Sequence, residues 1–156
     1  MSNKFIKITL ILFVIISLKH CGYQPLLTDK YQKFDIVTFD ITGDKKLGQM
    51  LANRFIEVES AENKLVFKIN SAKAREISNK DDAGRIIEYS ININLNLNAI
   101  SVVDGNSVFA KNYSEKRTYK ASNFYIDTLN REKKIEDDLV KSIANRIIND
   151  LNLVYR

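Results

Sequence analysis

The chain is short of the residues that build most catalytic and metal sites. Its 156 residues include one cysteine, one histidine, one proline and no tryptophan. The histidine, His20, is close to the N-terminus, so the rest of the chain lacks the commonest general base and metal ligand. A G-x-S-x-G motif is also absent. The acidic run of residues 136–138 is better explained as a solvated helix face than as paired catalytic carboxylates. The sequence therefore argues against an enzyme and implies no cofactor or metal.

The N-terminus has the order of a bacterial export signal. Lys4 and Lys7 precede an apolar run from Ile8 to Leu18, and Cys21 follows. A run of this length is too short for an ordinary membrane-spanning helix, which needs ~20 residues. We predict an export or lipoprotein signal over residues 1–20, a tether over 21–33 and a single domain over 34–156.

Cys21 is the candidate for lipid attachment. Leu18, three residues before it, suits a lipoprotein signal, whereas Lys19 and His20 replace the small residues expected next to the cysteine. Residues 1–20 contain no Ala or Gly, so an ordinary A-x-A cleavage site is missing too. Acylation at Cys21, cleavage elsewhere (for example after Ser17) and an uncleaved anchor all remain open. We expect export, with lipid attachment as the favoured outcome.

The basic charge of the chain comes largely from this signal. The whole sequence has 24 Lys and Arg against 19 Asp and Glu. Lys4, Lys7 and Lys19 belong to the signal, which contains no acid, so the remainder has 21 basic and 19 acidic residues. The near balance removes the main support for nucleic-acid binding.

Hydrophobic periodicity predicts an α+β domain. The expected fold is a two-layer sandwich in which two helices pack on one face of a four-stranded, mostly antiparallel sheet, in the order β-α-β-β-β-α. Strands are expected at 34–41, at 65–69 with a polar extension toward residue 77, at 87–99 and at 108–119; helices are expected at 47–58 (about four turns) and 127–151.

The third strand has the clearest pattern. Apolar residues at odd positions from Ile87 to Ala99 alternate with a polar row of Ser90, Asn92, Asn94, Asn96 and Asn98. After a turn at Asp104–Asn106, the returning strand places Phe109, Tyr113 and Tyr119 in the core row. Glu115 and Arg117 fall in the same row, so either they pair with neighbours near the end of the sheet or a bulge shifts the register.

Four segments together resemble the family of LptE, the lipopolysaccharide-assembly lipoproteins, in its alphaproteobacterial-type branch. They are the start Cys-Gly-Tyr-Gln-Pro-Leu at 21–26, the helix entry Leu-Gly-Gln-Met-Leu at 47–51, the long alternating strand with its Gly-containing hairpin and Tyr119-ending return strand, and the last helix from Asn123 through Glu132 to Ile147. Their order and spacing carry the resemblance, and each motif alone is weak.

The resemblance implies a non-enzymatic outer-membrane protein, lipid-anchored on the periplasmic side. Members of the family plug the LptD β-barrel, assist its assembly and take part in delivering lipopolysaccharide to the cell surface. LptD, lipopolysaccharide and the outer membrane would then be the partners. The row from Ser90 to Asn98 would face the polar barrel lumen, although open antiparallel sheets commonly have such a solvated face. A barrel-independent, periplasmic lipid-binding lipoprotein that assists transport is the alternative, and a surface structural lipoprotein is a third possibility.

Basic residues give candidates for an anion or lipopolysaccharide site. If the strands alternate in direction, the connections at 79–84 and 120–127 meet at one end of the molecule, and the Asp104 turn is at the other. That end would collect Lys80, Arg85, Arg117, Lys120 and Arg131. Lys80 also falls in the loop where the family has a basic lipopolysaccharide contact. Alternatively, Asp81, Asp82 and Glu115 neutralise this group.

Overall fold

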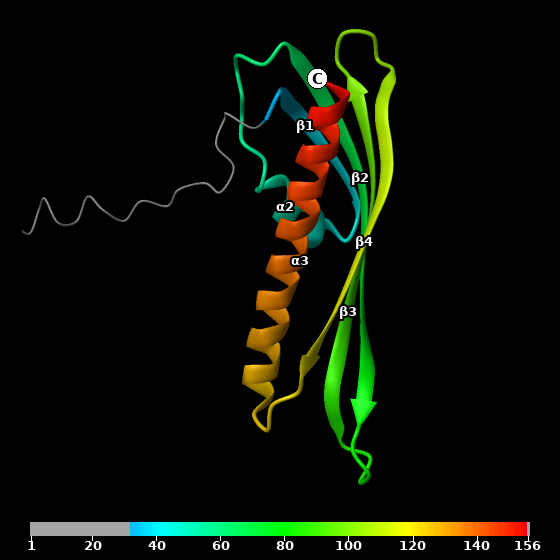
Figure 1. Cartoon of the computed structure of the whole chain (residues 1–156), viewed down its shortest axis with the longest axis vertical. Helices are drawn as coiled ribbons and strands as arrows, with labels where there is room; N and C mark the ends of the chain where they lie inside the picture. Colours follow the sequence, from blue (N-terminus) through cyan, green and yellow to red (C-terminus); the bar gives the residue numbers. More distant parts are fainter. Residues whose placement is uncertain (1–31, 156) are drawn as a thin grey trace, which may run out of the picture.

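The computed structural model describes residues 32–155, which form one elongated two-layer domain (Figure 1). The predicted signal, Cys21 and all but the last two tether residues are outside this range. The elements are β1 (Phe34–Gly43), α2 (Lys45–Ala52), β2 (Asn63–Lys80), β3 (Ile86–Ser101), β4 (Ser107–Lys120) and α3 (Tyr125–Val154). Within the described range, no helix is long and apolar enough to cross a membrane.

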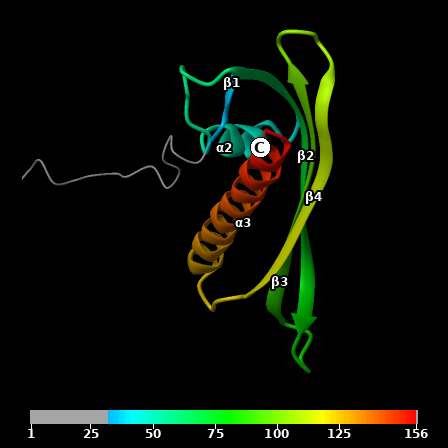
Figure 2. The ribbon, with the colours of Figure 1, turned by 45° about the horizontal axis from the view of Figure 1, so that its top comes forward.

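The four strands form one open sheet in the order β1-β2-β3-β4. β1 runs parallel to β2, and the other neighbours are antiparallel. Both helices cover the same face, which Figure 2 shows from a second direction. The predicted α+β two-layer fold and its element order are therefore confirmed.

The core fills the space between this face and the helices. Ile91, Ile93, Leu95, Leu97 and Ala99 of β3 are all buried, as the alternation predicts. They pack with the inward row of β2 and with α3, whose buried residues recur every three or four positions. At one end, the Phe55 and Phe67 rings meet edge to face with centroids 5.4 Å apart.

The first helix is shorter than predicted. The Asp44 side chain caps it by accepting a hydrogen bond from the backbone N–H of Leu47 at 3.0 Å, but the helix ends at Ala52 instead of near Val58. Tight turns follow, and a loop brings Phe55 and Val58 to the core. Their helical spacing was misleading because a loop can also place apolar residues on the core. The last helix is longer than the expected 127–151.

The register of β4 accounts for Glu115 and Arg117. The ladder with β3 is continuous from Phe109 to Lys120, so no bulge occurs at these residues. Both side chains are on the helix-facing side and pair with α3. The Glu115 carboxylate accepts a 2.7 Å hydrogen bond from Arg146, and the Arg117 guanidinium is 3.6 Å from the carboxylate of Asp138. Ion pairs to the helix thus take the place of apolar packing along this edge strand.

Glu136 corrects the interpretation of the acidic run. Its side chain is 3% exposed, so it does not belong to a solvated face. The Nζ atoms of Lys73 on β2 and Lys46 on α2 are 3.0 and 3.5 Å from its two carboxylate oxygens. Asp137 pairs with Arg54, and Asp138 with Arg117. The run therefore ties α3 to the sheet and to the segment around α2, because the basic partners come from other elements.

Candidate interaction surfaces

The face of the sheet opposite the helices is not covered by any element of the described chain. Four of the five predicted polar residues of β3 are accessible there: Asn94 and Asn96 are exposed, and Asn92 and Asn98 are half-buried. Ser90 is only 2% exposed and cannot make a substantial contact with a partner. Alternation fixes the direction of a side chain, whereas neighbouring strands decide its accessibility.

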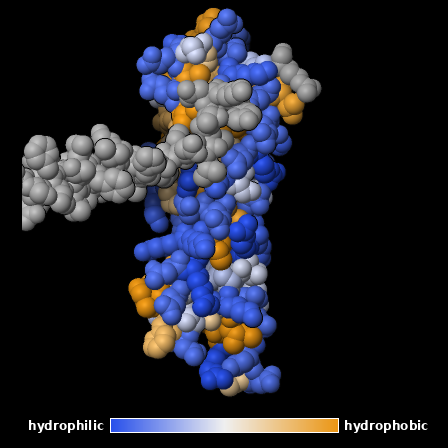
Figure 3. Space-filling view, turned by 60° about the vertical axis from the view of Figure 1, so that its left-hand side comes forward, coloured by the Kyte–Doolittle hydropathy of each residue, from blue (hydrophilic) through white to orange (hydrophobic). Residues whose placement is uncertain are grey.

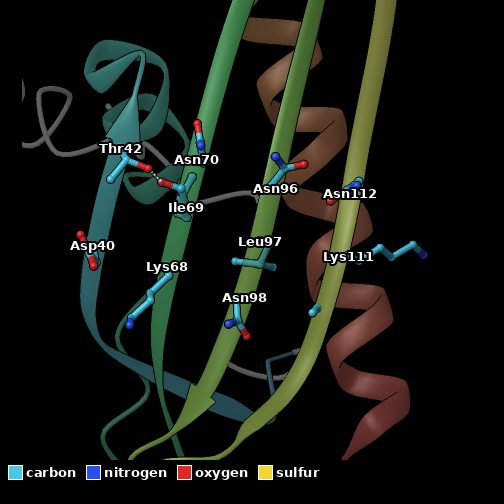
Figure 4. A pocket seen from close by; sticks show the side chains of 11 residues that line it. Asp40, Thr42, Lys68, Ile69, Asn70, Asn96, Leu97, Asn98, Lys111 and Asn112 are labelled. Atoms are coloured by element: carbon cyan, nitrogen blue, oxygen red, sulfur yellow. Dashed lines mark hydrogen bonds between the residues drawn. The ribbon is translucent and has the colours of Figure 1, made fainter.

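Strand pairing extends the asparagine row across the sheet. Asn96 is paired with Asn70 of β2 on one side and with Asn112 of β4 on the other, and Figure 4 shows the three side by side. We call Asn70, Asn92, Asn94, Asn96, Asn98 and Asn112 the amide patch. Asn70 and Asn112 were not among the residues predicted from the sequence. Asn70 follows the core residue Ile69, and Asn112 precedes the core residue Tyr113. Because side chains alternate along a strand, these positions could have indicated that both face the open side.

The patch borders a hollow of about 550 Å³ on the open face (Figure 4). Its floor includes Leu97 and Ala110, and its rim includes Asp40 and Lys68. Among the described residues, the amides of Asn70, Asn96 and Asn112 form no side-chain hydrogen bond, so their donors and acceptors face solvent.

The residues of the amide patch are uncharged, but charged residues on the neighbouring strands flank it. Lys68, beside Asp40, is paired with Asn98 at one end. Lys116, 3.5 Å from Glu76, is paired with Asn92 at the other. Ala72 and Ala74 of β2 are paired with Asn94 and Asn92. Their side chains are short, so they project little from the open face of the sheet. Amides donate and accept hydrogen bonds without the desolvation penalty of full charges. This surface is therefore suited to a polar, uncharged counterpart.

The second candidate surface is the end where the β2–β3 and β4–α3 connections meet. The backbone N–H of Ala121 donates to the carbonyl of Ile87 at 2.9 Å, and a hollow of about 570 Å³ lies between the two connections. Arg85 and Lys120 line it. Lys80 ends β2 beside it, and Arg131 donates from α3 to the Lys120 carbonyl at 3.3 Å. We call this the basic end.

Two of the five predicted basic residues are already paired with acids. The Arg85 Nε is 2.7 Å from Asp81, and hydrogen bonds from the Arg85 backbone and side chain hold the pKa of Asp81 below its ordinary value. Arg117 is on the helix side with Asp138 and does not join the group. Lys80, Lys120 and Arg131 have no ion pair within residues 32–155.

Exposed apolar side chains accompany the basic end. Phe124, Tyr125 and Ile126, at the start of α3, are 71, 66 and 61% exposed. The space-filling view of the helix side is mostly hydrophilic, with apolar groups near both its upper and its lower end (Figure 3). This end therefore combines unpaired cations with bulky apolar groups.

A polar cluster behind the basic end escaped sequence analysis. Arg75 of β2 lies 3.9 Å over the Tyr89 ring and 3.1 Å from the Glu132 carboxylate. The Tyr119 hydroxyl accepts a hydrogen bond from Arg75 at 3.0 Å and donates to Glu132 at 2.9 Å. Burial, followed by the hydrogen bond to Glu132, raises the pKa of Tyr119 to about 12. The cluster joins α3 to the sheet where apolar packing ends, which is a structural role.

Among the described residues, no group of three His, Cys, Asp or Glu side chains is arranged to hold a metal ion. The buried carboxylate of Glu136 pairs with lysines and does not face a cavity among the hollows described above.

Comparison with known proteins gives the fold. No protein-family model and no curated protein sequence matches this chain. Among solved structures, it is similar to the rare lipoprotein B from Shewanella oneidensis, at a TM-score of 0.56 and 12% identity over 76% of this chain and 96% of that one. The uncharacterized lipoprotein B from Nitrosomonas europaea matches at 0.54 and 12%, over 81% and 88%. The minor lipoprotein from Acinetobacter baumannii matches at 0.51 and 15%, over 78% and 93%. The chain therefore has the fold of these bacterial lipoproteins.

Proposed function

We propose that this protein is an outer-membrane lipoprotein, anchored through Cys21 on the periplasmic side, that plugs an LptD-type β-barrel and takes part in delivering lipopolysaccharide. The observation that carries the proposal is the uncovered amide patch on a domain with a bacterial lipoprotein fold. The export signal and the family resemblance of the sequence support the same role.

The patch has the chemistry that a barrel lumen requires. The interior of a large outer-membrane barrel is polar, because lumen-facing and lipid-facing side chains alternate along its strands. Side-chain amides can bond to lumen groups of either kind, donor or acceptor. The small side chains of Ala72 and Ala74 let a second surface approach closely. A patch without charges also avoids the desolvation cost of burying them.

The length of the domain fits a plug as well. α3 has 30 residues and is about 45 Å long. A bilayer with its headgroups is about 40–45 Å thick. A domain of this length inside a barrel would reach from one side of the membrane to the other.

The basic end supplies the proposed contact with lipopolysaccharide. Phosphates and acidic sugars bind well to Lys and Arg side chains that have no competing acid. Lys80, Lys120 and Arg131 meet this condition, whereas Arg85 and Arg117 do not. The nearby Phe124–Ile126 segment provides apolar surface next to these cations.

The alternative function, a lipid-binding lipoprotein that works without a barrel, has less support. It requires a closed apolar cavity for acyl chains. The hollows on the open face and at the basic end have more polar and charged than apolar residues in their lining. A third hollow, beside β1, includes Phe39 and Phe55 but also Asp35, Glu57 and Lys64.

The test is a mild-detergent pull-down of the tagged protein from its native envelope. We expect a one-to-one complex with a large β-barrel, and its loss in Asn94→Arg/Asn96→Arg. The matched control is Asn145→Arg, an exposed position on α3. If the protein with the wild-type sequence were recovered from solubilised outer membrane without any partner, the plug function would be excluded. Equal loss in the control would mean that the helix side also faces the barrel.

A further inference from the structure

The end of the domain opposite the basic end, where the described chain enters the fold, carries four exposed aliphatic side chains. Val102 and Val103 in the β3–β4 turn are 49 and 88% exposed, and Leu153 and Val154 at the end of α3 are 60 and 47% exposed. The Lys33 backbone N–H donates to the Asn152 side chain at 3.1 Å, which fixes the entry point beside the last turn of α3. We call this the entry end.

The turn holds Val103 outward in a defined position. Gly105 adopts φ +68° and its N–H donates to the Ser101 carbonyl at 3.0 Å. The Asp104 carboxylate accepts from the Asn106 backbone at 3.3 Å and side-chain amide at 3.0 Å. The Val102 N–H donates to the backbone carbonyl of Lys64 on β2 at 3.0 Å. Turn apices usually carry Gly, Asn, Asp or Ser, so a rigid turn that presents two valines to solvent is unusual.

The length of the chain before the entry point indicates what covers these side chains. Lys33 is 12 positions after Cys21 in the sequence. A chain of this length spans at most about 40 Å when fully extended. Any lipid surface that holds the N-terminus is therefore within reach of the entry end. The basic end is separated from it by the length of α3, about 45 Å.

We propose that the entry end rests on the lipid surface that holds the N-terminus, with Val103 and Leu153 inserted among the lipid headgroups. The inference rests on the proposed anchoring of the chain and concerns the anchored protein outside a barrel, so it requires neither a barrel nor lipopolysaccharide. The occupant is a bilayer because the anchor keeps it next to these residues.

The charges at the entry end specify the kind of lipid. Exposed Glu57, Glu59 and Glu62 lie in the loop before β2, at this end of the sheet, and Asp104 is in the turn. Among residues 32–155, the exposed bases there are Lys33 and Lys64. Acids outnumber bases among these residues, so attraction to anionic lipid does not drive the contact. Apolar insertion into a zwitterionic leaflet fits the composition, and salt should have little effect on it.

The absence of tryptophan from the chain allows a direct test. A single Val103→Trp substitution, at an exposed turn position, gives a reporter without background. The matched control is Phe124→Trp at the basic end, where the native side chain is 71% exposed. The full chain, purified with its own N-terminus, is reconstituted into phosphatidylcholine vesicles with and without brominated lipid.

We expect the Val103→Trp emission to shift to the blue and to be quenched severalfold by brominated lipid at low and high salt, while Phe124→Trp is unaffected. Failure of the entry-end reporter to respond overturns the proposal, and so does quenching at both ends, because the domain would then lie flat. Loss of quenching at high salt excludes apolar insertion. The vesicles contain no barrel, so these outcomes are independent of the plug function. Labelling with radioactive palmitate in cells tests acylation of Cys21 separately.

Discussion

Lys73 and Glu136 form an ion pair between the sheet and α3, with 3.0 Å between the lysine Nζ and a carboxylate oxygen. The Glu136 side chain is 3% exposed and that of Lys73 is 24% exposed. Lys46 approaches the second oxygen at 3.5 Å from a largely exposed position. A carboxylate this deeply buried depends on its partners, because an unpaired charge in the interior is strongly destabilising.

Removing the lysine alone should therefore cost more than removing both charges. We expect Lys73→Met to lower the free energy of unfolding by about 3 kcal/mol. The double variant Lys73→Met/Glu136→Met should recover most of this loss, because apolar side chains of similar size can replace an ion pair. Urea denaturation measures both. A double variant no more stable than Lys73→Met would show that the buried charge is not the cause.

Gly48 should tolerate no side chain, because a Cβ there would collide with the Ile41 side chain on β1. We expect Gly48→Ala to lower the free energy of unfolding by about 1–3 kcal/mol, although alanine favours a helix by about 1 kcal/mol. The control is Ile41→Ala, which removes the colliding group. A thermodynamic cycle of the two should give a favourable coupling energy, and simple additivity would contradict the contact.

The Tyr119 hydroxyl should contribute to stability through the Arg75 cluster. It is hydrogen-bonded to both Arg75 and Glu132. We expect Tyr119→Phe to cost about 1–2 kcal/mol in urea denaturation, since two charged groups lose a partner. Tyr89→Phe is the matched control: the Tyr89 ring stacks on Tyr119 with centroids 5.7 Å apart, and the phenyl ring keeps that contact. Equal effects of the two variants would show that the hydrogen bonds of the Tyr119 hydroxyl to Arg75 and Glu132 are not the cause.

Asp150 should make the domain sensitive to acid. Its partial burial favours the neutral form, but hydrogen bonds from Lys111 at 2.8 Å and Tyr113 at 2.7 Å outweigh this and lower its pKa. Because the folded pKa is below the unfolded value, the stabilisation is fully present above about pH 4. It is lost as pH falls through the folded pKa. Urea denaturation at a series of pH values should show a smaller acid-induced loss in Asp150→Asn than in the wild-type protein. Equal losses would contradict this role.

The sequence predicted most of the fold because its periodicities are local. The alternation from Ile87 to Ala99 gave the long central strand and its buried face, and the turn at Asp104 gave the pairing of Tyr113 with the core. The sequence did not predict where α2 ends, because Phe55 and Val58 keep helical spacing after the helix has stopped.

The candidate surfaces were predicted less completely. The polar direction of Asn94 and Asn96 followed from alternation, but the contribution of Asn70 and Asn112 depends on register between strands. The prediction that Lys80 and Lys120 lie at the same end of the domain followed from the alternating direction of the strands. The pairing of Arg117 with Asp138 could not be predicted, because it requires the position of α3 across the sheet.

The hydrogen bond between Lys33 and Asn152 has a consequence for engineering. It brings the start and the end of the described domain together, so a short linker could join them without crossing the fold. New termini could then be opened in the turn of Asp81–Gly84, at the opposite end of the sheet. Such a circular permutant would keep every strand pairing, but its N-terminus would be at the basic end instead of the entry end. Comparing it with the wild-type protein would show whether the binding surfaces depend on which end of the domain is anchored.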